Sequence, residues 1–203
     1  MFKKENILPE LELKDQVYAD FGVRLGAFLL DLLILSPMII YMEYGRSSTL
    51  VFNTTIHFVY FLFVNCYFIY FMKKYGGTPG KLITGIVIIK TDLSSINWND
   101  TFKRNIDGII YSIINSILTV YVLSKNDNTI YSSLPKDKQV HYIKSLHNHS
   151  LEILHYSNEI WIVASIICLL INQRKRTLHD FIAGTIVIRK RYLTAIINNK
   201  KEE

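Results

Sequence analysis

Two ionisable residues, Arg24 and Asp31, lie inside the apolar segment 21–44, which is long enough to cross a lipid bilayer. A charged side chain near the centre of a membrane-spanning helix costs roughly 2.5 to 3.5 kcal/mol on the insertion scale. The segment holds about a dozen large aliphatic and phenylalanine side chains, and their combined contribution of about −5 kcal/mol outweighs that cost. The segment can therefore insert with its charges, and ionisable residues inside a span indicate a functional site.

The spacing of Arg24 and Asp31 places both side chains on one face of a helix. Seven residues make two turns, so the two positions lie about 10.5 Å apart along the axis, and the Asp31 side chain leans back towards Arg24. Direct pairing requires a fully extended Arg24, and a water molecule or another helix could bridge the two instead. With the N-terminus in the cytoplasm, Arg24 lies near the interface, where it can snorkel, and Asp31 lies deeper.

The position of Asp31 suits either of two roles. Burial favours the protonated carboxyl group, whereas a nearby guanidinium favours the ionised one. A carboxyl group balanced between these effects is suited to proton or cation exchange. The alternative is a structural salt bridge that fixes the packing of the helices.

Other residues with possible chemistry give weaker indications. Glu152, His155 and Glu159 share one helical face, and a Glu-x-x-His pattern can bind metals inside helical bundles. Such a site needs further ligands from a partner helix, which the sequence does not show, so a solvated face is preferred and neither a metal nor a cofactor is expected.

The turn 75–82 superficially resembles a phosphate loop but lacks the first glycine and the final Ser or Thr of that motif. We expect no ATP binding and, without a nucleophile–base pair, no enzyme.

Four apolar blocks carry most of the hydrophobic residues, which make up 50% of the 203 residues, while 20% are charged. We predict that the blocks form transmembrane helices at about 21–44, 50–72, 106–123 and 156–172. The first two reach the roughly 20 residues that a span requires, and the third is shorter. The fourth is long enough to cross the membrane only if residues 156–159 are part of the span. A buried soluble helix is the alternative for it, although the chain offers no soluble core large enough to bury such a helix.

The distribution of positive charge predicts how the chain is oriented. The net charge is +6, from 23 lysines and arginines against 17 acidic residues. With four spans and the N-terminus inside, five basic residues lie outside: Arg46, Lys125, Lys136, Lys138 and Lys144. The other 18 lie on the cytoplasmic side, in accord with the positive-inside rule. We therefore expect a multi-pass cell-membrane protein with both termini in the cytoplasm, and no nucleic-acid partner. Residues 1–20 form a cytoplasmic lead-in rather than a cleaved signal peptide, and 191–203 form a charged tail.

The segments before and after the third span predict further elements. Trp98, Phe102 and Ile106 fall on one face of a helix, which predicts an amphipathic interfacial helix leading into the third span. The outer loop 124–157 is long for a connection and could be an element in its own right.

Two β-branched runs, 84–90 and 183–190, resemble each other in sequence. We expect them to pair as a small two-stranded element on the cytoplasmic side. The alternative is that both are apolar segments that dip separately into the interface. The predicted fold class is thus all-α, a polytopic helical membrane protein of about four transmembrane helices, with an interfacial amphipathic helix and a small two-stranded cytoplasmic β element.

Three motifs carry a resemblance to a known family: the stretch Arg24–Asp31, the loop Gly77–Lys81 and the segment Leu178–Thr185. Together they resemble the RDD family of small polytopic membrane proteins, which is named for one arginine and two aspartates. Those three match Arg24, Asp31 and Asp180, and Arg104 matches the arginine that commonly precedes the family's later span. The likeness covers roughly 18–191, and residues 21–190 are expected to form a single RDD-like membrane domain. The outer loop departs from the family's short connection, so no function is carried over to that side.

The resemblance implies architecture more than chemistry. Some members of the family resemble sodium/proton antiporters in activity, and others look like accessory or assembly factors. The leading hypothesis is cation/proton exchange with Asp31 as the protonatable group; the alternative is a non-enzymatic membrane scaffold or assembly factor. The expected partners are the lipid bilayer, a monovalent cation or proton, and a second copy or another membrane protein, because four spans are few for a transporter.

Asp180 follows three basic residues, so it is expected near the cytoplasmic interface, at the depth of Arg24. We predict a contact between Arg24 and Asp180, with Asp31 further in and less well matched, although pairing of Arg24 with Asp31 stays open. The predicted charge network is therefore Arg24, Asp31, Asp180 and Arg104.

Overall fold

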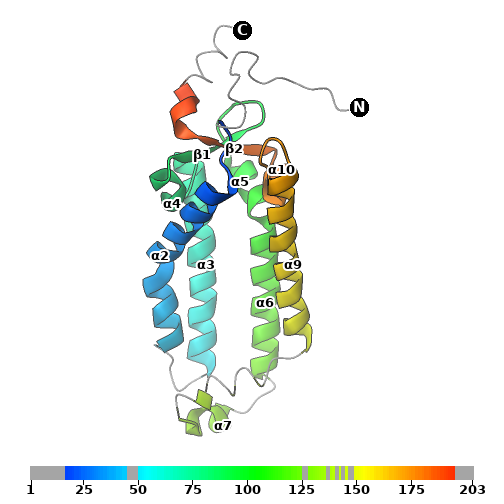
Figure 1. Ribbon diagram of the computed structural model, residues 1–203. Coiled ribbons are helices and arrows are strands. Elements are labelled where there is room, and N and C mark those ends of the chain that lie inside the picture. Colours follow the sequence, from blue (N-terminus) through cyan, green and yellow to red (C-terminus); the bar gives the residue numbers. More distant parts are fainter. Residues whose placement is uncertain are drawn as a thin grey trace.

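Four long helices form the body of the protein. The computed structural model describes residues 17–44, 50–124, 128–135, 138–139, 142, 145 and 149–194. The long helices are α2 (Phe21–Tyr44), α3 (Leu50–Tyr75), α6 (Ile106–Ser124) and α9 (His149–Ile171). Figure 1 shows them running side by side, with α2 next to α3 and α6 next to α9.

The shorter elements gather mainly at one end of this bundle, the upper end in Figure 1. They are α4 (Pro79–Ile83), β1 (Ile86–Lys90), α5 (Trp98–Arg104), α10 (Leu178–Ala183), β2 (Thr185–Arg189) and the short 3₁₀ helix η1 (Lys190–Tyr192). The helix α7 (Asn128–Ser133) lies at the opposite end. The bundle therefore has a structured end, which is built from segments far apart in the sequence.

The two strands pair in an antiparallel sheet, from Ile86 opposite Arg189 to Lys90 opposite Thr185. The first four residues of each strand are buried, because β1 and β2 pack between two apolar clusters, one on each face of the sheet. The predicted pairing of 84–90 with 183–190 is confirmed, and the alternative of two separate dipping segments is wrong.

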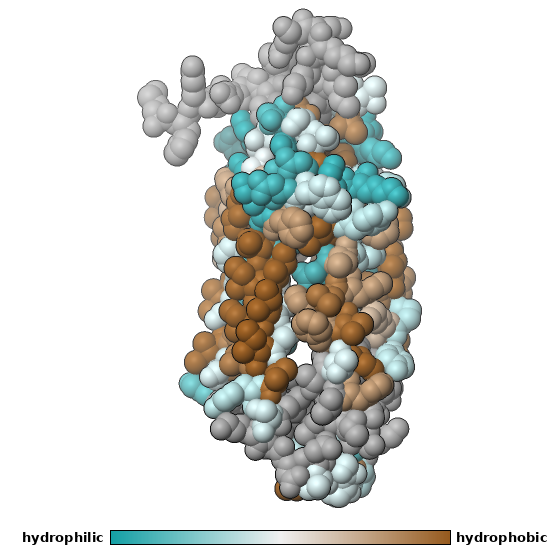
Figure 2. All heavy atoms as spheres, turned by 180° about the vertical axis from the view of Figure 1, so that it is seen from behind, coloured by the Kyte–Doolittle hydropathy of each residue, from teal (hydrophilic) through white to brown (hydrophobic). Residues whose placement is uncertain are grey.

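Two helices are long and apolar enough to cross a membrane, by length and composition, among the residues that the structure describes: Phe21–Tyr41 within α2, and His149–Ile171. Ile106–Leu118 in α6 is a shorter apolar helix. Only 17% and 11% of the most apolar stretches of the first two are buried within the protein. Their apolar side chains therefore face outward, and Figure 2 shows a largely brown surface over the helices beside a teal end.

The fourth long helix extends beyond the predicted span towards the outer loop. The helix α9 begins at His149, not near residue 156, and α7 occupies part of the predicted loop 124–157. The predicted span begins where hydrophobicity rises, near residue 156. The helix itself begins earlier, because polar side chains do not interrupt backbone hydrogen bonding in a helix. The expectation that the segment 124–157 could carry an element in its own right is confirmed by α7.

The predicted amphipathic helix is present as α5. Its start is a capping box, in which the Asn97 side chain accepts from the Asp100 amide and the Asp100 side chain accepts from the Asn97 amide. Trp98 and Phe102 are exposed, whereas Asp100 and Arg104 are buried. The helix thus turns its polar face inward and its aromatic face outward, as a helix at a lipid interface does.

Candidate functional site

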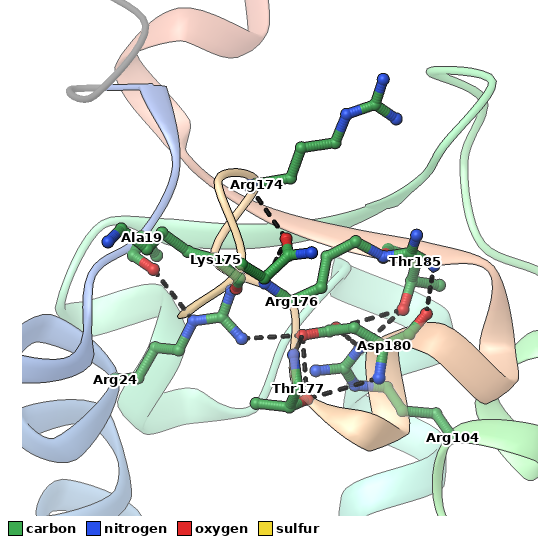
Figure 3. A network of polar contacts seen from close by, with 10 residues as sticks. Ala19, Arg24, Arg104, Arg174, Lys175, Arg176, Thr177, Asp180 and Thr185 are labelled. Carbon is green, nitrogen blue, oxygen red and sulfur yellow. Dashed lines mark hydrogen bonds and ion pairs between the residues drawn. The ribbon is translucent and has the colours of Figure 1, made fainter. Parts of the chain in front are cut away.

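A buried carboxylate, Asp180, is the centre of the charge cluster at the structured end (Figure 3). Its side chain is fully buried and contacts two guanidinium groups. Arg24 Nη1 donates to Asp180 Oδ2 over 2.8 Å, and Arg104 Nη1 donates to Oδ1. The predicted contact of Arg24 with Asp180 is confirmed, and Arg104 joins it.

Asp180 is the third residue of α10, and the residues at both ends of this short helix hold it in place. Thr177 caps this helix, and its backbone amide and hydroxyl donate to Asp180 Oδ2 over 3.0 and 2.9 Å. The helix ends at Gly184, whose φ of 64° is a left-handed conformation that glycine adopts at little cost. A capping box and a glycine stop therefore place one carboxylate at the junction of α10 and β2.

The two arginines tie distant segments to this carboxylate. Arg24 also donates from Nε to the carbonyl of Ala19 over 3.0 Å and from Nη2 to the carbonyl of Lys175. Arg104 donates to the Thr185 hydroxyl over 2.6 Å. The cluster thereby joins the start of α2, the end of α5 and the segment from α10 to β2.

Electrostatics around Asp180 favour its ionised form. Burial alone would raise the pKa of Asp180, but the guanidinium groups of Arg104 and Arg24 outweigh it and hold the pKa well below its usual range. A carboxyl group with a depressed pKa contributes stability above its unfolded-state pKa of about 3.9, and this stability is lost as the pH falls. Asp180 is therefore a permanent anion at neutral pH.

Asp31 has a separate set of partners. Its carboxylate is 3% exposed and accepts hydrogen bonds from the Tyr67 hydroxyl at 2.9 Å, the Thr78 hydroxyl at 2.5 Å and the Gly80 amide at 2.8 Å. No contact joins Asp31 to Arg24 in the described part of the chain. Of the two carboxylates that could pair with Arg24, it is therefore Asp180 that does so. Asp31 is less well matched in charge than Asp180, as expected: its three donors are uncharged, whereas two guanidinium groups contact Asp180.

These contacts give Asp31 the role of a helix cap supplied from another helix. Thr78 is the N-cap of α4 but makes no cap hydrogen bond to that helix, since its hydroxyl donates to Asp31. The Gly80 amide is one of the free donors of the first turn, and Asp31 accepts from it. Asp31 therefore links α2, α3 and α4 at one point.

Gly80 is required by the close approach of α4 to α2. A Cβ atom at this position would lie 2.1 Å from the carbonyl oxygen of Ala27 and 2.8 Å from Asp31 Cγ. Pro79 precedes it at the first position of the helix, where the missing amide donor is not needed. The loop that sequence analysis singled out is thus a docking turn that packs against Asp31.

Lys81 follows in the same short helix. It is half-buried, and no hydrogen bond or ion pair joins its amino group to the described residues. The loss of surrounding water lowers the pKa of Lys81 to about 7, and the Arg104 guanidinium acts in the same direction, against the carboxylates of Asp31 and Asp180. This residue was not predicted as part of the site; the signal for it was a lysine between the turn and the apolar pair Leu82–Ile83.

A second polar pair lies beside the cluster and was also missed. His179 Nε2 is 2.8 Å from Asp107 Oδ2, and the Trp161 indole nitrogen is 3.4 Å from the same histidine nitrogen. These residues come from α10, α6 and α9, and nothing in their spacing along the chain predicts that they meet.

The predicted histidine-rich face lies apart from this cluster, along α9. His155 Nδ1 is 2.9 Å from the Tyr111 hydroxyl, and His149 approaches Glu152 at 3.7 Å. Within the described ranges, no three His, Cys, Asp or Glu residues are grouped as a metal site would require.

Fold and cluster together define a helical protein with a largely apolar outer surface, closed at one end by a buried Arg–Asp–Arg set. An apolar outer surface with paired charges inside is typical of a membrane protein. The family profile of the RDD family matches residues 18–184, and the chain belongs to that family. Its membership makes this a membrane protein. Comparison with curated proteins and with solved structures found no match.

Proposed function

We propose that the four long helices all cross the membrane and that both termini lie in the cytoplasm. The outward-facing apolar side chains of α2 and α9 support this arrangement, as does the excess of basic residues in the segments that form the structured end. The charge cluster then lies near the cytoplasmic interface, and α7 lies on the outer side.

Labelling of single cysteines tests this orientation. In a background with Cys66 and Cys168 replaced by alanine, Ser132→Cys in α7 and Ser95→Cys near the sheet place thiols at opposite ends of the bundle. We expect a membrane-impermeant maleimide to label the first in intact cells and the second only after permeabilisation. Labelling of both in intact cells would contradict the proposed topology.

We propose further that the protein exchanges a monovalent cation for a proton across this membrane. The observation that carries the proposal is a carboxylate, Asp31, buried among the helices and contacted by uncharged donors. An intramembrane carboxylate without a cation in contact can attract one. Four helices are few for a transporter, so the exchanging unit is proposed to be an oligomer.

Flux measurements in vesicles test this activity. For purified, reconstituted protein, an inward Na⁺ gradient is expected to drive proton efflux, and Asp31→Asn to abolish it. Because Asp31 also holds α4 in place, Tyr67→Phe is the matched control: it removes one hydrogen bond to Asp31 and keeps its charge. We expect Tyr67→Phe to lower the melting temperature while flux persists.

Two outcomes would contradict cation exchange. One is the absence of Na⁺-driven flux in the wild-type protein, and the other is unchanged flux in folded Asp31→Asn. Either outcome favours the second candidate, a membrane scaffold or assembly factor. That candidate is supported by the way Asp31 and Asp180 each join three segments of the chain.

A further inference from the structure

Lys74, in the last turn of α3, is held between two tyrosine rings. Its amino group donates to the Tyr70 hydroxyl over 2.9 Å and lies 5.3 Å from the centre of the Tyr70 ring and 5.2 Å from that of the Tyr75 ring. Both distances are within the roughly 6 Å over which an aromatic ring attracts a cation. Phe71 packs against both tyrosines, with ring centres 5.6 Å from Tyr70 and 5.8 Å from Tyr75. The packing of these rings therefore sets where the ammonium group lies.

The end of the helix alone does not explain this arrangement. Lysines in the last turn interact favourably with the free carbonyl groups there, which accounts for Lys73 and Lys74 together. It does not account for the exposed tyrosines that flank Lys74. Because the Tyr70 hydroxyl accepts from Lys74, its own hydrogen is directed elsewhere and can donate to an oxyanion that also contacts the ammonium group.

The charges at this end of the bundle favour an anionic ligand. Carboxylates of the described residues pair there with other basic side chains: Asp180 with Arg24 and Arg104, Asp100 with Lys90, and Asp20 with Arg189. None of the ion pairs within the described ranges involves Lys74, and Lys73 adds a second positive charge beside it. A negatively charged group would therefore match this pair of lysines.

An apolar stripe leads along α3 away from this site. It is made of Val59, Phe63 and Cys66, which are exposed. With Tyr70 and Lys74 they follow one face of the helix at intervals of three or four residues. The Lys74 end of α3 lies at the structured end of the bundle (Figure 1). In the proposed arrangement of spans, the stripe faces acyl chains and the tyrosines lie at the level of the headgroups, where aromatic side chains of membrane proteins gather.

We propose that Lys74, Tyr70 and Tyr75 form a binding site for one anionic phospholipid of the cytoplasmic leaflet. The lipid phosphate accepts from the Lys74 ammonium and the Tyr70 hydroxyl, and an acyl chain lies along the apolar stripe. The inference rests on the proposed spanning of the membrane by α3 and gives that span a specific ligand. A zwitterionic lipid binds more weakly, because its own ammonium group would lie beside those of Lys73 and Lys74.

Native mass spectrometry of the full chain in neutral detergent tests this preference. The probes are phosphatidylglycerol and phosphatidylcholine with the same acyl chains, and glycerol phosphate represents the headgroup without chains. We expect phosphatidylglycerol to bind about fivefold more tightly than phosphatidylcholine, the contribution of one lysine near a membrane surface, and glycerol phosphate not to displace it at equal concentration. Equal binding of the two lipids, or displacement by glycerol phosphate, would overturn the assignment to an anionic lipid.

Variants of the site sharpen the test. Lys74→Gln is expected to weaken phosphatidylglycerol binding about fivefold, and Tyr70→Phe, which keeps the ring, about threefold through the lost hydroxyl. Lys74→Arg keeps the positive charge and should bind like the wild-type protein. Lys190→Gln is the matched control, because Lys190 is an exposed lysine at the same end. Unchanged binding in Lys74→Gln, or an equal loss in Lys190→Gln, would contradict the site.

Photocrosslinking tests the path of the acyl chain. In phosphatidylcholine vesicles, a phosphatidylglycerol with a diazirine in one acyl chain should give adducts within 59–66 of α3, and fewer of them in Lys74→Gln. Adducts spread evenly over all four long helices would overturn the proposed site. The topology can fail separately: labelling of both engineered cysteines in intact cells would contradict the orientation, whereas equal binding of the two lipids would contradict the lipid site alone.

Discussion

Asp180→Asn is expected to lower the free energy of unfolding by about 3 to 5 kcal/mol, the cost of breaking a buried ion pair on one side. The substitution leaves two guanidinium groups, those of Arg24 and Arg104, without their shared counter-charge. The NH₂ group of the asparagine would also face an N–H or O–H group of the arginines or of Thr177, so that two hydrogen-bond donors would meet without an acceptor. Because the loss is comparable to the whole stability of many domains, folded protein should be scarce.

Thermal unfolding in detergent and the yield of folded protein measure this effect. Asp92→Asn is the matched control, since Asp92 is an exposed aspartate that accepts from neighbouring Ser94. A drop in melting temperature of the same size in both variants would contradict the role given to Asp180. The wild-type protein should also lose stability as the pH falls below about 4, because Asp180 has a depressed pKa in the folded state.

The reciprocal exchange Arg24→Asp with Asp180→Arg is not expected to restore stability. Asp180 serves two arginines, so the new arginine would lie beside Arg104 and add a like charge. Arg24 also donates to two backbone carbonyls, which an aspartate cannot do. The cluster is therefore a three-residue unit, and a pairwise exchange cannot replace it.

Gly80→Ala is the second substitution with a large expected effect, a loss of about 1 to 3 kcal/mol from overpacking, together with weaker contacts to Asp31. The added Cβ would lie 2.1 Å from a backbone oxygen of α2, at Ala27, which cannot move aside as a side chain can. Helix α4 must therefore shift, and the amide of Gly80 moves away from Asp31. Since the proposed cation exchange rests on Asp31, which loses this hydrogen bond, any exchange should fall as well.

A glycine without such neighbours provides the control. Gly108→Ala in α6 introduces a Cβ with nothing within 4 Å, and replacing a helical glycine by alanine usually stabilises by about 0.5 to 1 kcal/mol. We expect melting temperature to fall for Gly80→Ala and to hold or rise for Gly108→Ala. Equal changes in the two variants would show that α4 does not dock on Asp31 as described.

Several features could be predicted because they depend on local sequence or on a repeating pattern. Apolar blocks predicted the long helices, and β-branched runs predicted the strands that pair at 86–90 and 185–189. The contact of Arg24 with Asp180 followed from their expected equal depth, and Arg104 was placed in the network through the family resemblance. The helix α9 continues into a polar segment before the predicted span, a length that hydrophobicity alone does not predict.

By itself, therefore, the sequence determined the long helices, the paired strands, the family and three members of the charge cluster, because hydrophobic periodicity and charge act along the chain. The tertiary structure alone decided what each charge contacts. Asp31 is a cap for α4 rather than a partner of Arg24, and Asp180 is shared by Arg24 and Arg104. These roles depend on which backbones approach within a few ångströms, at positions such as Gly80, and such distances are set by packing between segments far apart in the sequence.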